Sequence, residues 1–425
     1  MLDLKFVREN PELVQKAIEN KNESADVGKV LELDEKRRAI IAEVESLKAL
    51  RNKVSEQIGI KKKNKEDAAD EISRMKEVGE KISGLDNDLR SVNEALEHHL
   101  LRIPNIPHES VPVGCDEESN VTVKEWGKVV PFEFEPLPHW ELGEKFDMID
   151  LSAAAGIAGS GFYVLKGMGA TLQRALVSYM MDTHHRDGFV EIVPPVLSNP
   201  MAMTGTGQLP KLEDDMYYLK DDDYYLIPTG EVPVTNLHRE QIIAEEKLPI
   251  NYVAFTSCFR REAGAAGKDT RGMLRVHQFD KVELVKIVHP DKSYDELETL
   301  LHQAEKIVQG LNLPYRVRLL ATGDLSFAAA KCYDIEIWSA GVGNFLEVSS
   351  VSNFLDFQAR RMNTRFRDKN GKPRFVHTLN GSGVALPRLI AAVMENYQTD
   401  YGTIVIPEVL RPYMNGQAEI TDSDK

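Results

Sequence analysis

The chain has 425 residues, of which 42% are hydrophobic and 28% charged, and its formal net charge is −15. This composition is ordinary for a folded globular protein, and the length allows two or more domains with separate cores. No stretch approaches the roughly 20 apolar residues of a membrane-spanning helix, and the opening run MLDLKFVRENPELVQ lacks the apolar core of a secretory signal. We therefore expect a cytosolic protein with no membrane partner.

Cysteine and histidine usage gives no indication of a structural metal. Cys115, Cys258 and Cys332 lie far apart without a CxxC pair, so we expect reduced thiols. The pairs His98–His99 and His184–His185 are adjacent in sequence, so the side chains of each pair point apart, and no zinc site is expected. The negative net charge is an average over the chain, and a nucleic-acid partner would need only a local basic surface.

Residues 1–26 are predicted to form a short helical lead-in, and residues 27–101 a pair of long helices. Gly is scarce and Pro absent in this second stretch. Apolar residues recur at spacings of three and four, the pattern of a coiled-coil seam, on both sides of the polar stretch Gly59–Asp70. The two halves of the seam are Ile40, Val44, Leu47, Val54 and Ile58, and Ile82, Leu85, Leu89, Val92 and Leu96. An antiparallel helical hairpin is therefore predicted.

Charge in this hairpin is segregated between the two helices. Residues 36–65 hold ten Lys or Arg against three Glu, whereas residues 66–102 hold five basic against ten acidic residues. One interpretation is that the oppositely charged helices attract each other. The other is that the first helix presents a cationic stripe to a phosphate backbone.

A proline-rich stretch from Arg102 to Gly114 ends the helical region, because proline stops helices and favours extended chain. We expect an N-terminal domain over residues 1–102, a linker over 103–120, a second domain over 121–416 and a disordered acidic tail over 417–425. The pattern of the second domain is α+β. It begins with an amphipathic helix over 170–187 and a strand over 188–195 that ends in prolines.

A strand from Tyr224 stops at Pro228 and is followed by Thr229, Gly230 and Glu231. A hydroxyl and a carboxylate around a glycine would suit a small ligand that carries an ammonium group. The same three residues also fit an ordinary helix start with an N-cap and an acidic first turn. The residues alone leave both interpretations open.

Two strands are predicted around a Gly-rich connection, over Ser257–Glu262 and Leu274–Ile287. Alternation would place Arg275, His277, Phe279, Lys281 and Glu283 on one face of the second strand. Arg260 at a strand end offers a planar fork for phosphate oxygens, and a nearby aromatic ring offers a platform for a base. The pattern favours a nucleotide pocket over the alternative, a hairpin with one solvated face.

Two later segments add a metal candidate and an anion candidate. Residues 333–362 read as two strands about a turn at Gly341–Asn344, then a helix, with Glu347 and Ser350 suited to Mg²⁺. In residues 377–398 a close turn is predicted at Gly381 and Gly383, followed by a helix from about Ala385. Arg388 in its first turns would reinforce an anion site at the helix N-terminus.

These segments together resemble one family. The run CFRREAGAAGKDTRGMLRVHQFDKVE is similar to motif 2 of the class II aminoacyl-tRNA synthetases, in the form found in seryl-tRNA synthetases. Residues 170–195 resemble motif 1, used for dimer contacts, and His377–Gln398 resembles motif 3, with Pro387 where the class often has Glu. The helical hairpin resembles the tRNA-binding arm of the seryl enzymes, and IPEVLRPYMNG their C-terminal end.

The resemblance implies a coiled-coil arm followed by a class II catalytic domain on a mostly antiparallel sheet flanked by helices. It implies a homodimer that activates L-serine with ATP and Mg²⁺ and charges tRNA(Ser), with tRNA(Sec) left open as a second acceptor. The implied catalytic residues are Arg260 and Arg388, and the implied metal ligands are Glu347 and Ser350. The implied serine-binding residues are Thr229, Glu231, Glu283 and Ser382, and the implied ATP-binding residues are Arg260, Arg261, Glu262, Val276, Phe279, Glu347, Val348, Ser349, Ser350 and Arg388.

Two alternatives stay open. One is a synthetase-like enzyme that activates an amino acid for a carrier protein or for another tRNA, although the long arm counts against a carrier protein. The other is a non-enzymatic coiled-coil adaptor that has kept an inactive fold. Against the adaptor counts the joint presence of Arg260, Glu262, Phe279, Glu283, Glu347 and Arg388.

Overall fold

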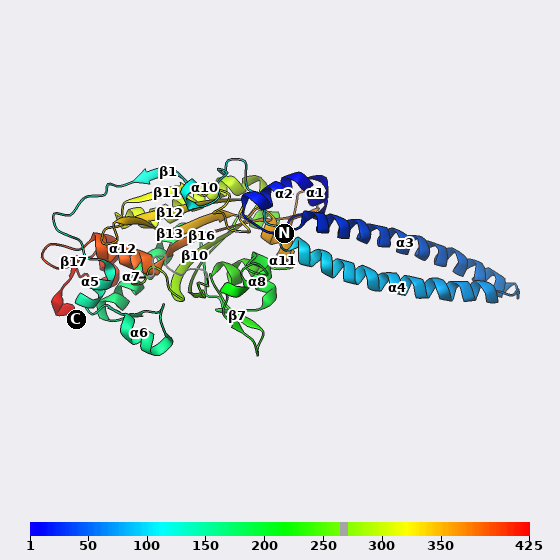
Figure 1. The fold of residues 1–425 in the computed structure, drawn as a ribbon, viewed down its shortest axis with the longest axis horizontal. Coiled ribbons are helices and arrows are strands. Elements are labelled where there is room, and N and C mark those ends of the chain that lie inside the picture. The colour runs from blue at the N-terminus through cyan, green and yellow to red at the C-terminus, as the bar shows by residue number, and fades with distance from the viewer. Residues whose placement is uncertain (264–270) are drawn as a thin grey trace. The chain divides into compact units, whose positions relative to one another are not determined.

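The structure is a computed structural model that describes residues 1–263 and 271–425. The chain divides into two compact units, Met1–Pro104 and Asn105–Lys425, shown in Figure 1. The predicted Gly-rich connection between the two motif strands falls mostly on residues 264–270, which lie outside the described part of the chain.

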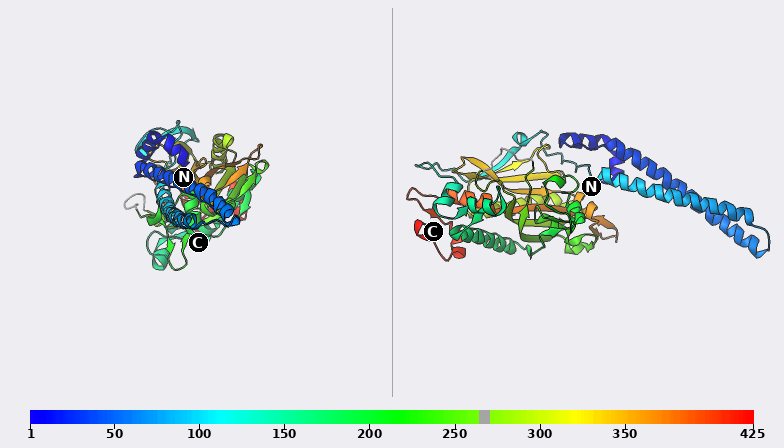
Figure 2. Two further views of the ribbon diagram at one scale, coloured as in Figure 1. Left: turned by 90° about the vertical axis from the view of Figure 1, so that its right-hand side faces the viewer. Right: turned by 60° about the horizontal axis from the view of Figure 1, so that its bottom comes forward.

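The first unit is helical, with α1 (Leu4–Glu9), α2 (Pro11–Asn20), α3 (Val27–Lys63) and α4 (Ala69–Leu100). Figures 1 and 2 show α3 and α4 side by side along their length. Ile40 and Val44 of α3 and Ile82, Val92 and Leu96 of α4 are buried between them. The predicted hairpin is confirmed, and its turn is shorter than the predicted polar tip, because both helices continue into that stretch.

Both interpretations of the arm's charges have a structural counterpart. Lys48 pairs with Asp86 at 3.8 Å and Lys81 with Glu43 at 2.6 Å, so oppositely charged side chains do join the two helices. Arg51 and Lys53 of α3 are exposed to solvent. Part of the cationic stripe is therefore accessible to a partner.

Among the described residues of the second unit, an eight-stranded sheet runs in the order β1-β11-β12-β13-β16-β10-β9-β4. The edge pair β4–β9 is parallel and the other pairs are antiparallel, so the sheet is mostly antiparallel, as expected from the sequence. The strands are β1 (Val121–Trp126), β4 (Val190–Ile192), β9 (Ile250–Phe259), β10 (Gln278–Val288), β11 (Tyr315–Leu319), β12 (Lys331–Ser339), β13 (Asn344–Asn353) and β16 (His377–Ala385).

Three helices pack on this sheet and enclose the main hydrophobic core: α7 (Gly167–Arg186), α10 (Ser293–Gly310) and α12 (Leu386–Asn396). Val282 and Leu284 of β10 point into that core, so their neighbours Lys281 and Glu283 face the other side. Shorter helices complete the unit: α5 (His139–Lys145), α6 (Leu151–Ala158), α8 (Pro200–Thr206), α9 (Glu231–Thr235) and α11 (Phe357–Met362).

Short strands form separate small sheets. They are β2 (Ile149–Asp150) with β3 (Val164–Leu165); β5 (Leu197–Ser198), β6 (Tyr218–Leu219) and β7 (Tyr224–Leu226); β8 (Ile242–Ala244), β14 (Arg365–Arg367) and β15 (Pro373–Phe375); and β17 (Ile404–Val405) with β18 (Glu419–Ile420). None of the helices in the described part of the chain combines the length and apolar character that a bilayer crossing requires.

Two predictions in the motif region are wrong. The strand predicted from Leu274 begins only at Gln278, because the main chain before it is held elsewhere: the His277 amide donates to the Gly161 carbonyl at 2.8 Å. The close turn predicted at Gly381 and Gly383 is part of β16. Gly383 falls at a register shift, and a Cβ there would lie 2.9 Å from a Val282 methyl group, so glycine serves close packing.

The two ends of the second unit are also more ordered than predicted. The expected linker is hydrogen-bonded to the rest of the second unit: the side-chain amide of Asn105 donates to the Ala328 and Phe354 carbonyls at 2.9 and 2.8 Å. The expected disordered tail contains β18, which pairs with β17 and buries Ile420. The strand pairing and the burial of Ile420 therefore order this segment, although its acidic composition predicted disorder.

Candidate active site

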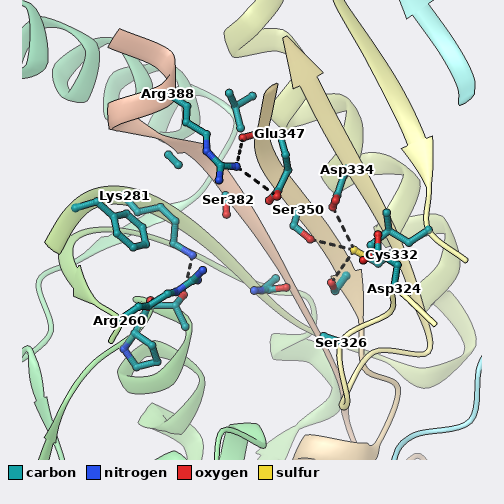
Figure 3. A pocket seen from close by; sticks show the side chains of 18 of the residues that line it. Arg260, Lys281, Asp324, Ser326, Cys332, Asp334, Glu347, Ser350, Ser382 and Arg388 are labelled. Atoms are coloured by element: carbon teal, nitrogen blue, oxygen red, sulfur yellow. Dashed lines mark hydrogen bonds and ion pairs between the residues drawn. The ribbon is translucent and has the colours of Figure 1, made fainter. Parts of the chain in front are cut away.

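A cavity of about 880 Å³ opens in the second unit beside strands β10, β12, β13 and β16. Eleven of the fourteen residues that the family resemblance implies for catalysis or for binding serine, ATP and metal line this cavity, and Figure 3 shows it from close by. Those that line it are Thr229, Glu231, Arg260, Glu262, Val276, Phe279, Glu347, Val348, Ser350, Ser382 and Arg388.

Arg260 lies just beyond the end of β9 and extends across the neighbouring strand. Its guanidinium carbon is 5.3 Å from the centre of the Phe279 ring, so the cation and the ring are already stacked. The Arg260 amide donates to the His277 carbonyl at 2.9 Å, which ties the strand end to the segment before β10. A cation and an aromatic face are thus held side by side at the cavity wall.

Arg388 projects from the first turn of α12, on the opposite wall in Figure 3. It donates to the Leu274 carbonyl at 3.1 Å and to the Glu347 carbonyl at 2.6 Å, and its guanidinium is 3.4 Å from the Glu347 carboxylate. These contacts hold the planar group against the cavity lining, with a carboxylate beside it. Arg388 and Arg260 therefore offer two separate cations to one polyanionic ligand.

One corner of the cavity is a buried polar network around Glu283, whose side chain is fully buried. Its carboxylate accepts from the Thr229 hydroxyl at 3.2 Å and from the Asn380 amide at 3.0 Å, and it pairs with Lys281. The same Asn380 amide donates to Glu231 at 3.1 Å. Two carboxylates thus share one corner, which favours a cationic group in the ligand.

Glu231 carries the clearest electrostatic signature in this corner. Burial, followed by the nearby Glu283, raises its pKa to about 7. The Glu231 amide also donates to the Thr229 hydroxyl at 3.2 Å, although the N-cap of α9 is Gly230 and no side chain caps this helix. Glu231, which begins α9, and Thr229 both line the cavity.

Three sequence-predicted residues lie outside the cavity lining. Arg261 is exposed, and its amide donates to the Asp215 carbonyl at 2.9 Å. Ser349 is buried, and its hydroxyl donates to the Ser382 carbonyl, because alternation turns it away from Ser350. Glu283 is covered by Thr229 and Asn380 and lies just behind the surface. Glu262 lines the cavity and pairs with Arg275 at 2.5 Å.

Comparison with known proteins agrees with this geometry. The family model for the seryl-tRNA synthetase N-terminal domain matches residues 1–107, and the model for the class II tRNA synthetase core domain (G, H, P, S and T) matches residues 213–397. The chain is 53% identical to the serine–tRNA ligase of Desulfitobacterium hafniense (strain DSM 10664 / DCB-2), over 97% of this chain and 99% of that protein. The chain belongs to the seryl-tRNA synthetase family.

A further relative is the serine–tRNA ligase of Geobacter sulfurreducens, 52% identical over 99% of this chain and 100% of that protein. The crystal structure of seryl-tRNA synthetase from Pyrococcus horikoshii complexed with ATP superposes with a TM-score of 0.93 at 38% identity, over 99% of each chain. The predicted membership of the seryl-tRNA synthetase family and the predicted fold class are thereby confirmed.

Sequence reasoning missed site residues that the fold brings to this synthetase cavity. Lys281 was placed on the right face but given no role, although its ammonium donates to the Thr229 hydroxyl at 2.8 Å. Asn380 lies two residues before Ser382 on β16, so alternation along that strand could have found it. Asp334 of β12 lies across from Ser350, and burial and Glu347 raise its pKa well above the usual range.

The structure holds oxygen ligands suited to a hard cation at the β12–β13 side of the cavity. Glu347 and Ser350 both line it, and the Ser350 hydroxyl is 3.0 Å from the Cys332 sulfur. The described residues contain no cluster of three or more His, Cys, Asp or Glu side chains placed to hold a metal. Mg²⁺ keeps several waters and binds with one or two protein ligands plus phosphate oxygens, so this sparse set fits it.

Proposed function

We propose that this chain activates L-serine with ATP to form seryl-adenylate and pyrophosphate, then transfers the seryl group to the 3′ end of tRNA(Ser), releasing AMP. The observation that carries the proposal is a single cavity whose lining holds a guanidinium beside an aromatic ring together with a buried acidic corner. It occurs in a chain of the seryl-tRNA synthetase family.

In the first step a serine carboxylate oxygen attacks the α-phosphorus of ATP, and pyrophosphate leaves. No protein nucleophile is needed, so the residues act by positioning and charge neutralisation. Arg260 contacts the α-phosphate and Arg388 the γ-phosphate. The adenine lies between Phe279 and Arg388, with Glu262 and the Val276 main chain at its edge.

The acidic corner selects the amino acid. Thr229 and Glu231 bind the ammonium group. Ser382, which lines the cavity, and Glu283, which lies just behind Thr229 and Asn380, bind the hydroxyl, so serine must displace one of these two covering side chains to reach Glu283. A pocket built to hydrogen-bond a hydroxyl rejects the analogue without it by roughly 10⁴-fold or more, because its buried polar groups would be left unpaired. Alanine is excluded in this way, and threonine by the contact of its extra methyl group with the wall.

The proposal is tested by ATP–pyrophosphate exchange with a panel of amino acids. We expect exchange with serine and, by comparison, very little with alanine or threonine. Exchange with another amino acid would indicate a synthetase of different specificity, and no exchange with any amino acid would indicate the inactive adaptor. Charging assays should include tRNA(Ser) and tRNA(Sec) as separate acceptors.

Mg²⁺ is the proposed metal: Glu347 and Ser350 would hold it together with ATP, and it would supply charge neutralisation for the phosphates. Replacing Glu347 with glutamine removes a negative ligand, so the Mg²⁺ concentration for half-maximal exchange should rise by about 10-fold or more. The measurement is a Mg²⁺ titration at saturating ATP and serine. An unchanged midpoint for both Glu347→Gln and Ser350→Ala would place the metal elsewhere.

The proposal also includes a homodimer and a role for the N-terminal arm, whose basic helix would contact the tRNA backbone. Val190 in the edge strand β4 of the main sheet and Val193 just after it are exposed apolar side chains, and both lie in the region that resembles motif 1. An apolar edge of this kind is suited to pairing with a second copy. The cytosol is the proposed location, since all three cysteines are free thiols.

A further inference from the structure

Gln358 is a buried glutamine at the second position of α11, 1% exposed, and it lies behind the acidic corner without lining the cavity. Its side-chain amide makes three hydrogen bonds. Nε2 donates to the Glu231 carboxylate at 2.6 Å and to the Thr206 carbonyl at 3.0 Å, and Oε1 accepts from the Thr378 hydroxyl at 2.7 Å.

These contacts permit only one orientation of the amide. A flipped amide would place its carbonyl oxygen against the Thr206 carbonyl, which only accepts hydrogen bonds, and against the ionised form of the Glu231 carboxylate, which also only accepts. The Thr378 hydroxyl on β16 and the Thr206 carbonyl at the end of α8 thus determine which way Gln358 points. The Glu231 carboxylate receives a short, charge-assisted bond from a group that cannot turn away.

The charges around Glu231 show what this bond counteracts. Glu283 of β10 repels it, while Lys281 of β10 and Arg260 beyond β9 attract it, and Asn380 and Gln358 donate to it as neutral groups. Lys281 pairs with Glu283, and among the described residues no cation lies within ion-pair distance of Glu231. The bond from Gln358 lowers the pKa of Glu231, against the larger upward effect of burial.

We propose that Gln358 is a positioning residue for the synthetase reaction, which holds the Glu231 carboxylate in one orientation and in its ionised form to receive the ammonium group of the amino acid. The proposal rests on the assignment of Glu231 to the serine site. Gln358 itself touches no substrate. Its contribution is to keep the Glu231 carboxylate oriented and ionised before the amino acid binds.

The test is Gln358→Met, which preserves side-chain length and burial and removes all three hydrogen bonds. We expect the KM for serine in pyrophosphate exchange to rise by about 10-fold or more while the KM for ATP stays within about 2-fold. The acidic limb of the pH profile of kcat/KM for serine should move to higher pH, because Glu231 would then ionise less readily. Thr378→Val should shift the same quantities in the same direction by a smaller factor.

Gln398 provides a matched control. It is also buried, and its side-chain amide makes three bonds, to the Leu137 amide and to the Leu137 and Glu395 carbonyls at 2.8–2.9 Å, away from the acidic corner. Gln398→Met should lower the melting temperature as Gln358→Met does and leave both the KM for serine and the pH profile unchanged.

Two outcomes would overturn the proposal: an unchanged KM for serine in Gln358→Met, or equal rises in the KM values for serine and ATP, which indicate a generally loosened domain. If Gln358→Met does not fold, the same measurements on Thr378→Val decide: an unchanged KM for serine, or equal rises in the KM values for serine and ATP, overturns the proposal. Glu231→Gln separates the two levels of inference. If it leaves the KM for serine unchanged, the assignment of Glu231 to the serine site is wrong, and the positioning role of Gln358 is overturned with it.

Discussion

Glu283→Ala is expected to lower kcat/KM for serine in pyrophosphate exchange by about 10³-fold or more, with ATP binding still measurable. The carboxylate is fully buried and accepts from Thr229 and Asn380 while it pairs with Lys281. Removing it takes away the proposed contact to the serine hydroxyl. It also leaves the Lys281 ammonium buried without its counter-ion, which adds to the loss.

Glu283→Gln separates these two effects. The amide keeps the shape of the side chain but loses the negative charge, so exchange should fall less than in the alanine variant. ATP binding, measured by calorimetry in the absence of serine, should stay within about 3-fold of the unaltered protein for both variants, because the contacts of Glu283 are to Thr229, Asn380 and Lys281 and not to the Arg260–Phe279 pair. Unchanged exchange in Glu283→Ala would remove this residue from the serine site.

Deleting the arm from Lys36 to Glu97 and joining its ends with a short Gly/Ser linker is expected to spare adenylate formation and abolish tRNA charging. The cavity residues all belong to the second compact unit, so exchange should stay within about 3-fold of the full-length protein. Charging should fall below detection, because the arm supplies the proposed contact to the tRNA backbone. Charging that survives the deletion would make the basic helix a structural feature only.

A charge variant tests the same arm without removing it. Arg51 and Lys53 are exposed on α3, and replacing both with glutamine should raise the KM for tRNA and reduce the salt dependence of tRNA binding, by a slope of about 1 for each phosphate that is no longer neutralised. Lys81→Gln is the matched control, because Lys81 is already paired with Glu43 across the hairpin. It removes the same kind of charge and should change tRNA binding much less.

Local patterns were sufficient for several elements of this protein. The three-and-four spacing of apolar residues predicts the α3–α4 hairpin, and the pattern around Gly341–Asn344 predicts β12, β13 and their turn. Such predictions hold because the spacing of side chains on one helix or strand depends on neighbouring residues alone. Arg260, Phe279, Glu347 and Arg388 were predicted from local pattern and from the resemblance to the motifs of the family, and all four line the cavity.

Contacts between distant segments were beyond that reasoning. Gln358 is 127 residues from Glu231, and Asn380 is 149 residues from it, yet all three meet in one corner. The two glycines of β16 were taken for a turn because a sequence does not show that Val282 and His184 would leave no room for a side chain at Gly383. The acidic tail was taken for disorder because its composition does not reveal that β17 is available to pair with it.

By itself, the sequence determined the helical arm, the α+β character of the second unit, the family and the residues that present cations and carboxylates. Only the tertiary structure decided which of these side chains share a cavity, which lie behind it, and which neutral groups orient them. The physical reason is that hydrogen bonds and burial act over a few ångströms in space, whatever the separation along the chain, so they become visible only when strands β10, β13 and β16 and helix α11 come together.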